Sequence, residues 1–156
     1  MNESILVIDD DANIRKMLSS ILEQEGYTVE TVENGKQGIK ASENAYFDVS
    51  LVDIELPDMK GVELLLELKR RQPKMIKIII TGSPTLENAI KAVNKGANGY
   101  VLKPFDVAEL LYMIRKLLDE RLAEQFRVYT EKSEMEKREE KFSGQFRKEK
   151  GSLFSH

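Results

Sequence analysis

The chain has 156 residues, of which 41% are hydrophobic and 33% are charged, and its net charge is −3. This composition is sufficient for one domain with a hydrophobic core plus an extension, and it argues against global disorder. Because there is no cysteine and the only histidine is the last residue, His156, we exclude disulfides, thiolate or histidine metal sites and Ser-His-Asp triads.

The sequence shows no sign of export, membrane insertion or nucleic-acid binding. No basic segment precedes the first short apolar run, as a secretory signal would require. No apolar stretch approaches the roughly 20 residues that cross a bilayer. Residues 119–156 carry nine acidic and nine basic side chains, so they form no basic patch. We therefore expect a soluble, cytoplasmic protein without direct contact to membrane or nucleic acid.

Residues 1–118 alternate short apolar runs with amphipathic stripes of helical period. The runs predict strands at residues 5–8, 28–32, 49–53, 78–81 and 100–102. The stripes predict helices at residues 14–25, 35–43, 61–72, 86–95 and 107–118. This alternation is typical of an α/β protein with right-handed βαβ connections. We expect a doubly wound, five-stranded parallel sheet of order 2-1-3-4-5 (flavodoxin-like) with five helices, the last of them extended.

Four of the predicted strands lead directly into polar, reactive side chains. Asp9 and Asp10 follow the first strand, Asp53 ends the third, Thr81 ends the fourth, and Lys103 follows the fifth. The carboxyl ends of parallel strands form the binding edge of such a sheet, and the order 2-1-3 places the first strand beside the third. Carboxylates, a hydroxyl and an ammonium at one edge suit a divalent cation and a phosphoryl group.

Five motifs share one order and spacing with a known family. They are Val7-Ile8-Asp9-Asp10-Asp11, Leu51-Val52-Asp53, Leu56-Pro57-Asp58-Met59-Lys60-Gly61, Ile80-Thr81-Gly82 and Tyr100-Val101-Leu102-Lys103-Pro104-Phe105. From residue 4 to about 118 the chain resembles the receiver domain of two-component response regulators. The resemblance implies a receiver over residues 1–118 and a charged, partly helical extension over residues 119–156. It also implies a protein that is not an enzyme beyond catalysing its own phosphorylation and dephosphorylation.

The resemblance implies that Asp53 accepts a phosphoryl group from a sensor histidine kinase or a phosphotransfer protein. Mg²⁺ would be bound by Asp10 and Asp53 directly, by Asp9 through water, and by the backbone carbonyl of Glu55.

Other residues would sense the phosphoryl group once it is bound. Thr81 and Lys103 would contact its oxygens, and Thr81 with Tyr100 would switch the surface formed by the predicted elements at residues 86–95, 100–102 and 107–118. The Lys103–Pro104 peptide bond would be cis, as is usual in receivers.

Two alternatives use the same residues differently. A phosphatase of the haloacid-dehalogenase type would use Asp9 as nucleophile, followed by Asp11, Thr81 and Lys103. Asn13 departs from that pattern, no acidic pair follows Lys103, and Asp53 would be left without a role. A receiver-like fold that serves only as an interaction module would have no reason to keep these charges.

The extension after residue 118 carries an apolar stripe of its own. Leu122, Phe126 and Tyr129 follow Leu118 at spacings of four, four and three residues. This pattern predicts that the last helix continues to about residue 130 or beyond. A solitary helix would leave the stripe in water, so we expect a partner: a second copy (our preferred interpretation), a target protein or a missing effector domain. The alternative is a frayed, charge-rich segment from about Glu131 onward.

Overall fold

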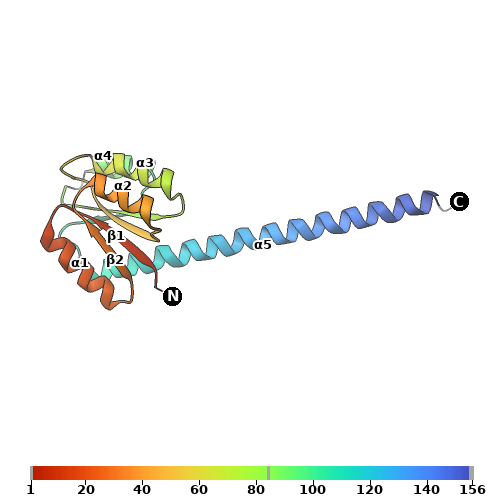
Figure 1. The fold of residues 1–156 in the computed structure, drawn as a ribbon, viewed down its shortest axis with the longest axis horizontal. Helices are drawn as coiled ribbons and strands as arrows, with labels where there is room; N and C mark the ends of the chain where they lie inside the picture. Colours follow the sequence, from red (N-terminus) through yellow and green to blue (C-terminus); the bar gives the residue numbers. More distant parts are fainter. Residues whose placement is uncertain (1, 84, 155–156) are drawn as a thin grey trace. The chain divides into compact units, whose positions relative to one another are not determined.

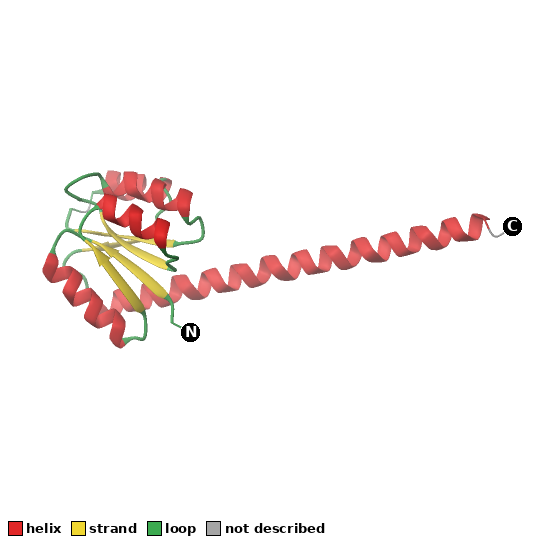
Figure 2. Ribbon diagram, in the orientation of Figure 1, coloured by secondary structure: helices red, strands yellow, loops and turns green. Residues whose placement is uncertain are grey.

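The computed structural model describes residues 2–83 and 85–154, without the side chains of residue 86 and residues 148–154. Five parallel strands form one sheet of order β2-β1-β3-β4-β5, with helices on both faces (Figures 1 and 2). The elements in chain order are β1 Ser4–Ile8, α1 Ala12–Gln24, β2 Thr28–Val32, α2 Gly35–Asn44, β3 Val49–Asp53, α3 Gly61–Arg71, β4 Ile76–Thr81, α4 Leu86–Asn94, β5 Gly99–Leu102 and α5 Val107–Phe154. The predicted fold class, strand order and long last helix are confirmed.

Two apolar layers cover the sheet because successive strand residues point to opposite faces. In β1, Ile5 and Val7 pack with α1 and with the first turns of α5, through residues such as Leu18 and Ile114. Leu6 and Ile8 pack on the other face, with α2, α3 and α4. Since β1, β3 and β4 are covered on both sides, most of their side chains are apolar, as is typical of buried parallel strands.

Three of the helices, α1, α2 and α4, start where the sequence supplies a side-chain cap. The carboxylate of Asp11 accepts the N–H groups of Asn13 and Ile14 at the start of α1. Asn34 and Thr85 cap α2 and α4 in the same way. Such caps satisfy N–H groups that have no partner within the helix. Asp11 is therefore engaged in capping.

The chain divides into two compact units, residues 1–118 and 119–156. The boundary falls within α5, whose residues up to Leu118 belong to the first unit. In the second unit the helix runs to Phe154, in agreement with the expectation of a helix to about residue 130 or beyond, while residues 155 and 156 lie outside the described part. From Glu131 onward the described residues are helical, unlike the frayed segment of the alternative. Among the described helices, none is both long enough and apolar enough to cross a membrane.

Candidate functional site

Three carboxylates meet at the carboxyl edge of the sheet. Ile8 pairs with Val52 in the register of β1 and β3, so Asp9 and Asp53, one residue further along each strand, are neighbours. Asp10 joins them, and one carboxylate oxygen from each of the three lies within 4.8 Å of the others. Asp9 and Asp53 are buried, whereas Asp10 is exposed. This arrangement brings together the three acidic side chains that the sequence assigned to one site.

Lys103 places its ammonium group against this acidic cluster. Its Nζ donates to Asp9 Oδ2 at 2.8 Å and to Asp53 Oδ2 at 3.3 Å. Burial acts to lower the pKa of Lys103, but the hydrogen bonds and charges of the two carboxylates outweigh it, so the pKa is raised. Lys103 therefore stays charged and offsets part of the repulsion among the acids. The Lys103–Pro104 peptide bond is cis.

The surroundings of Asp53 shift its pKa. Burial raises its pKa, and the charge of Asp9 adds to this effect. The N–H of Glu55, which donates to Asp53 Oδ1 at 3.0 Å, and the ammonium of Lys103 both act in the opposite direction. The net result is a raised pKa, which means that the ionised form of Asp53 is disfavoured in this site. A further positive charge beside Asp53, such as a cation, would favour the ionised form.

Thr81 and Tyr100 lie on adjacent strands at the other side of the cluster. Thr81 is fully buried, and its hydroxyl accepts the N–H of Ser83 at 3.0 Å. The backbone N–H of Lys103 donates to the Thr81 carbonyl at 2.6 Å, which ties the end of β5 to the end of β4. The Tyr100 hydroxyl is buried with no hydrogen-bond partner among the described residues, and burial raises its pKa.

Two polar contacts of the segments that follow β1 and β3 were missed by sequence reasoning. Arg15, on α1, donates from Nη1 to the carbonyl of Asp9 at 2.8 Å. Asp58, in the loop after β3, accepts the N–H groups of Gly35 and Lys36 at the start of α2, both at 2.9 Å. Although burial acts against it, these bonds lower the pKa of Asp58. Neither contact has a local sequence signal, because each partner is fixed by the tertiary structure.

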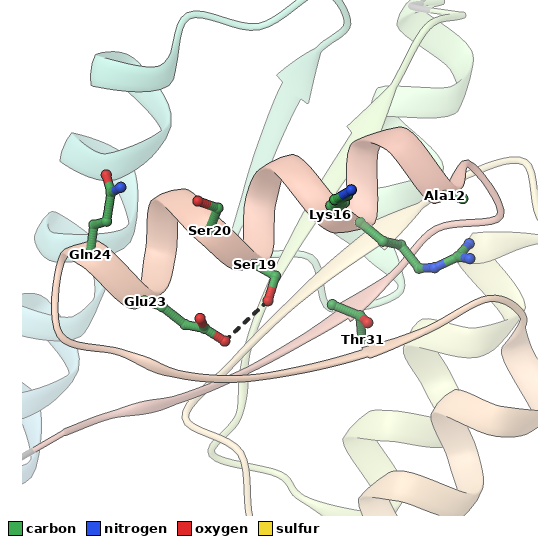
Figure 3. Close-up of a pocket in the computed structure, with 8 residues that line it drawn as sticks. Ala12, Lys16, Ser19, Ser20, Glu23, Gln24 and Thr31 are labelled. Atoms are coloured by element: carbon green, nitrogen blue, oxygen red, sulfur yellow. Dashed lines mark hydrogen bonds between the residues drawn. The ribbon is translucent and has the colours of Figure 1, made fainter.

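A separate hollow lies over α1 and β2 (Figure 3). Its lining residues are Ala12, Arg15, Lys16, Ser19, Ser20, Glu23, Gln24 and Thr31. Ser19 Oγ and Glu23 Oε1 form a hydrogen bond of 3.2 Å along α1. Within this described lining, Glu23 supplies the single carboxylate. The hollow therefore lacks the clustered acids that a phosphoryl site with a cation requires, and the strand-end cluster is the stronger candidate.

The comparison with protein families identifies the domain that carries this arrangement. The family model described as the response regulator receiver domain matches residues 5–115. The chain belongs to this family. Response regulator receiver domains are phosphorylated by histidine kinases, and they are in general not true enzymes, although they catalyse their own phosphorylation. The family match favours the receiver over the dehalogenase-type phosphatase.

Several curated transcriptional regulators are similar to this chain. The chain is 37% identical over 114 residues to the DNA-binding transcriptional regulator NtrC of Escherichia coli K12, and the match covers 73% of this chain and 24% of NtrC. The chain spans a quarter to a half of the length of the curated relatives AtoC, YkoG and NtrC.

Solved receiver structures are similar over nearly all of the first unit. A CheY-like receiver domain protein from Methanospirillum hungatei JF-1 is 41% identical, with a TM-score of 0.77, covering 80% of this chain and 99% of that one. A response regulator from Burkholderia pseudomallei, with a phosphorylated aspartic acid, a calcium ion and citrate, is 30% identical, with a TM-score of 0.71 and coverage of 80% and 73%.

The raised pKa of Asp53 predicts how its charge affects stability. Between the ordinary pKa near 3.8 and the raised folded value, the folded receiver binds more protons than the unfolded chain. Stability therefore falls as pH rises through this interval. Asp53→Asn, which carries no charge, is expected to be more stable than wild type at pH 7 without divalent cations, by about 1 kcal/mol. Lys103 keeps its bond to Asp9 in this variant.

Urea unfolding followed by circular dichroism, in the presence of a chelator, measures this difference from pH 3 to pH 7. The advantage of Asp53→Asn should shrink as the pH falls toward the ordinary pKa. A difference that is constant over this range, or a variant less stable than wild type at pH 7, would contradict the assignment.

Proposed function

We propose that this receiver accepts a phosphoryl group on Asp53 from the phosphohistidine of a sensor kinase or a phosphotransfer protein. The observation that carries the proposal is the convergence of Asp9, Asp10 and Lys103 on Asp53 at one edge of the sheet. A carboxylate oxygen of Asp53 would form a bond to phosphorus while the bond from phosphorus to the donor nitrogen breaks. Lys103 would move from neutralising the acids to neutralising charge on the transferred group.

The acidic cluster fits a hard divalent cation such as Mg²⁺, because it offers carboxylate oxygens from three residues within a small volume. Asp10 and Asp53 would bind the ion directly, Asp9 through water, and the backbone carbonyl of Glu55 would complete the ligands from the protein. When bound, the ion would supply positive charge to the carboxylates and the phosphoryl oxygens. The Burkholderia pseudomallei response regulator, with its phosphorylated aspartic acid and calcium ion, supports the binding of a divalent cation.

Thr81 and Tyr100 would transmit phosphorylation to the surface formed by α4, β5 and the first part of α5. The Thr81 hydroxyl, whose oxygen accepts the Ser83 N–H, would move to donate its hydrogen to a phosphoryl oxygen. Tyr100, whose hydroxyl lacks a partner among the described residues, would respond to the space that this movement creates. The surface presents exposed apolar side chains on which a partner could dock. They are Ile90, Val93, Leu102 and Tyr112.

Labelling with acetyl phosphate tests the proposed acceptor and separates it from the phosphatase alternative. After incubation with Mg²⁺, peptide mapping by mass spectrometry should place the phosphoryl group on Asp53. Label trapped on Asp9, together with steady release of phosphate from an aryl phosphate, would instead favour the dehalogenase-type mechanism.

Thr81→Ala is expected to be phosphorylated and yet to lose at least half of the conformational response around Tyr100. The substitution removes the hydroxyl that we propose links the phosphoryl group to β5. Amide chemical shifts of residues 99–103, measured before and after addition of beryllofluoride, report the response. Thr81→Ser keeps the hydroxyl and should respond as wild type does. Shift changes in Thr81→Ala as large as those in wild type would disprove the link.

We also propose that residues 119–147 pair with a second copy of the chain. Two lines of exposed apolar side chains run along this helical segment. Leu122, Phe126 and Tyr129 form the first line, and Val128, Met135 and Phe142 form the second. The spacing of seven residues in the second line is the heptad period of helices that pack against one another.

A further inference from the structure

The loop between β3 and α3 carries Glu55, whose carbonyl is a proposed metal ligand. The structure holds the base of this loop tightly. The N–H of Gly61 donates to the carbonyl of Ile54 at 2.9 Å, and Glu55 pairs with Lys60 as an antiparallel bridge. A Cβ on Gly61 would lie 2.5 Å from the carbonyl oxygen of Asp53, so only glycine allows the chain to return this closely.

The tip of the loop is held by a different set of contacts, from a different part of the chain. The two carboxylate oxygens of Asp58 accept the N–H groups of Gly35 and Lys36, each at 2.9 Å. Beside them, the side chain of Met59 packs on Gly35, where a Cβ would lie 2.5 Å from Met59 Cγ. We call the two hydrogen bonds of Asp58 the Asp58 tether. It joins the loop to the start of α2, 22 and 23 residues earlier in the chain.

We propose that Asp58 is a positioning residue for the metal site: the Asp58 tether fixes the loop, and the loop fixes the Glu55 carbonyl relative to Asp53. This inference rests on the proposed function. The N–H of Glu55 is already held by Asp53 Oδ1, so the peptide unit before Glu55 is anchored at the site itself. The peptide unit that carries its carbonyl lies between the base of the loop, held by the bridge to Lys60, and the tip, held by the tether. A ligand that is already oriented loses less entropy when the ion binds.

If Asp58 only capped the start of α2, its removal would affect the stability of the helix and not the metal site. The chain offers a matched control for this role. The start of α2 has a second cap, because Asn34 Oδ1 accepts the N–H of Gln37 at 2.9 Å. Asn34 does not belong to the loop after β3. Asn34→Ala should therefore weaken the start of α2 as Asp58→Ala does, but without releasing the loop that carries Glu55.

The test is a titration of the full chain with Mg²⁺, followed by amide chemical shifts at the acidic cluster, for wild type, Asp58→Ala, Asp58→Asn and Asn34→Ala. Asp58→Ala should raise the Kd for Mg²⁺ about tenfold, which is the lower end of the effect of outer-shell partners on metal affinity. Asp58→Asn should fall between it and wild type, because the amide oxygen still accepts one N–H. Asn34→Ala should shift the urea midpoint as Asp58→Ala does and leave the Kd unchanged.

The rate of labelling by acetyl phosphate gives a second readout. At limiting Mg²⁺, Asp58→Ala should react more slowly than wild type, and saturating Mg²⁺ should restore the wild-type rate, which a damaged fold would not allow. Equal Kd values for wild type and Asp58→Ala, or an equal rise in Asn34→Ala, would overturn this inference alone. A wild-type chain that binds no Mg²⁺ would overturn the proposed function and this inference with it.

Discussion

Asp53→Asn is expected to abolish phosphoryl incorporation from acetyl phosphate. The substitution keeps the size of the side chain and the bond that Lys103 makes to Asp9 at 2.8 Å, but it removes the carboxylate that would attack phosphorus. Asp9 and Asp10 lie close enough to share a cation with Asp53, yet we assign them to charge and metal binding. The intact mass of wild type should increase by one phosphoryl group, and that of the variant should stay unchanged.

Three controls show what this loss means. Chelation of divalent cations should suppress labelling of wild type, and Asp10→Asn should be labelled more slowly at limiting Mg²⁺, because one direct ligand is lost. Asp106→Asn alters an aspartate that caps the start of α5 and should be labelled as wild type is. Labelling of Asp53→Asn at the wild-type level, or labelling indifferent to the chelator, would disprove Asp53 as the acceptor.

Most residues of this site could be predicted because the direction of each parallel strand determines at which edge of the sheet its last side chain lies. Once the sheet is parallel, Asp53, Thr81 and the residue after Leu102 must lie at one edge, whatever the loops do. Side chains that meet across the tertiary structure could not be predicted in this way. The partners of Arg15 and Asp58 are backbone groups whose positions depend on how the neighbouring segments pack.

The start of β4 shows a second kind of limit. The apolar run predicts a strand from residue 78, but β4 begins at Ile76 and therefore includes Lys77. Lys77 is buried, burial lowers its pKa, and its Nζ donates to the carbonyl of Met75 at 2.9 Å. In a sequence, a charged residue normally marks the end of a buried strand. Only the structure shows that the Met75 carbonyl offsets part of the cost of burying the Lys77 ammonium.

In the extension, sequence reasoning found one apolar line and missed the other. Leu122, Phe126 and Tyr129 stand close together and continue the spacing of the preceding helix. Val128, Met135 and Phe142 are diluted by the charged residues between them, although their constant spacing of seven was a usable signal. Both lines became visible once the helix was found to continue through this segment, with all six side chains exposed.

Removal of residues 119–156 is expected to convert the protein from a dimer to a monomer. In a single copy, both apolar lines of the extension are exposed, with Phe126 at 71% and Phe142 at 73% of full exposure. Pairing of two such helices would remove this surface from water, at about 25 cal/mol per Å² of apolar area. Sedimentation equilibrium of the full chain should give twice the 17.9 kDa of one copy, whereas a chain ending at Leu118 should give its single mass.

Single substitutions then identify which apolar line forms the contact. Phe126→Glu disrupts the first line and Phe142→Glu the second, and each places a charge where the partner helix would pack. At 100° per residue, Lys141 lies on neither line, so Lys141→Glu should remain dimeric. If only Phe126→Glu yields monomers, the first line forms the interface. If only Phe142→Glu yields monomers, the second line forms the interface. Full-length wild type that sediments as a monomer, both with and without phosphodonor, would show that the segment does not pair with itself.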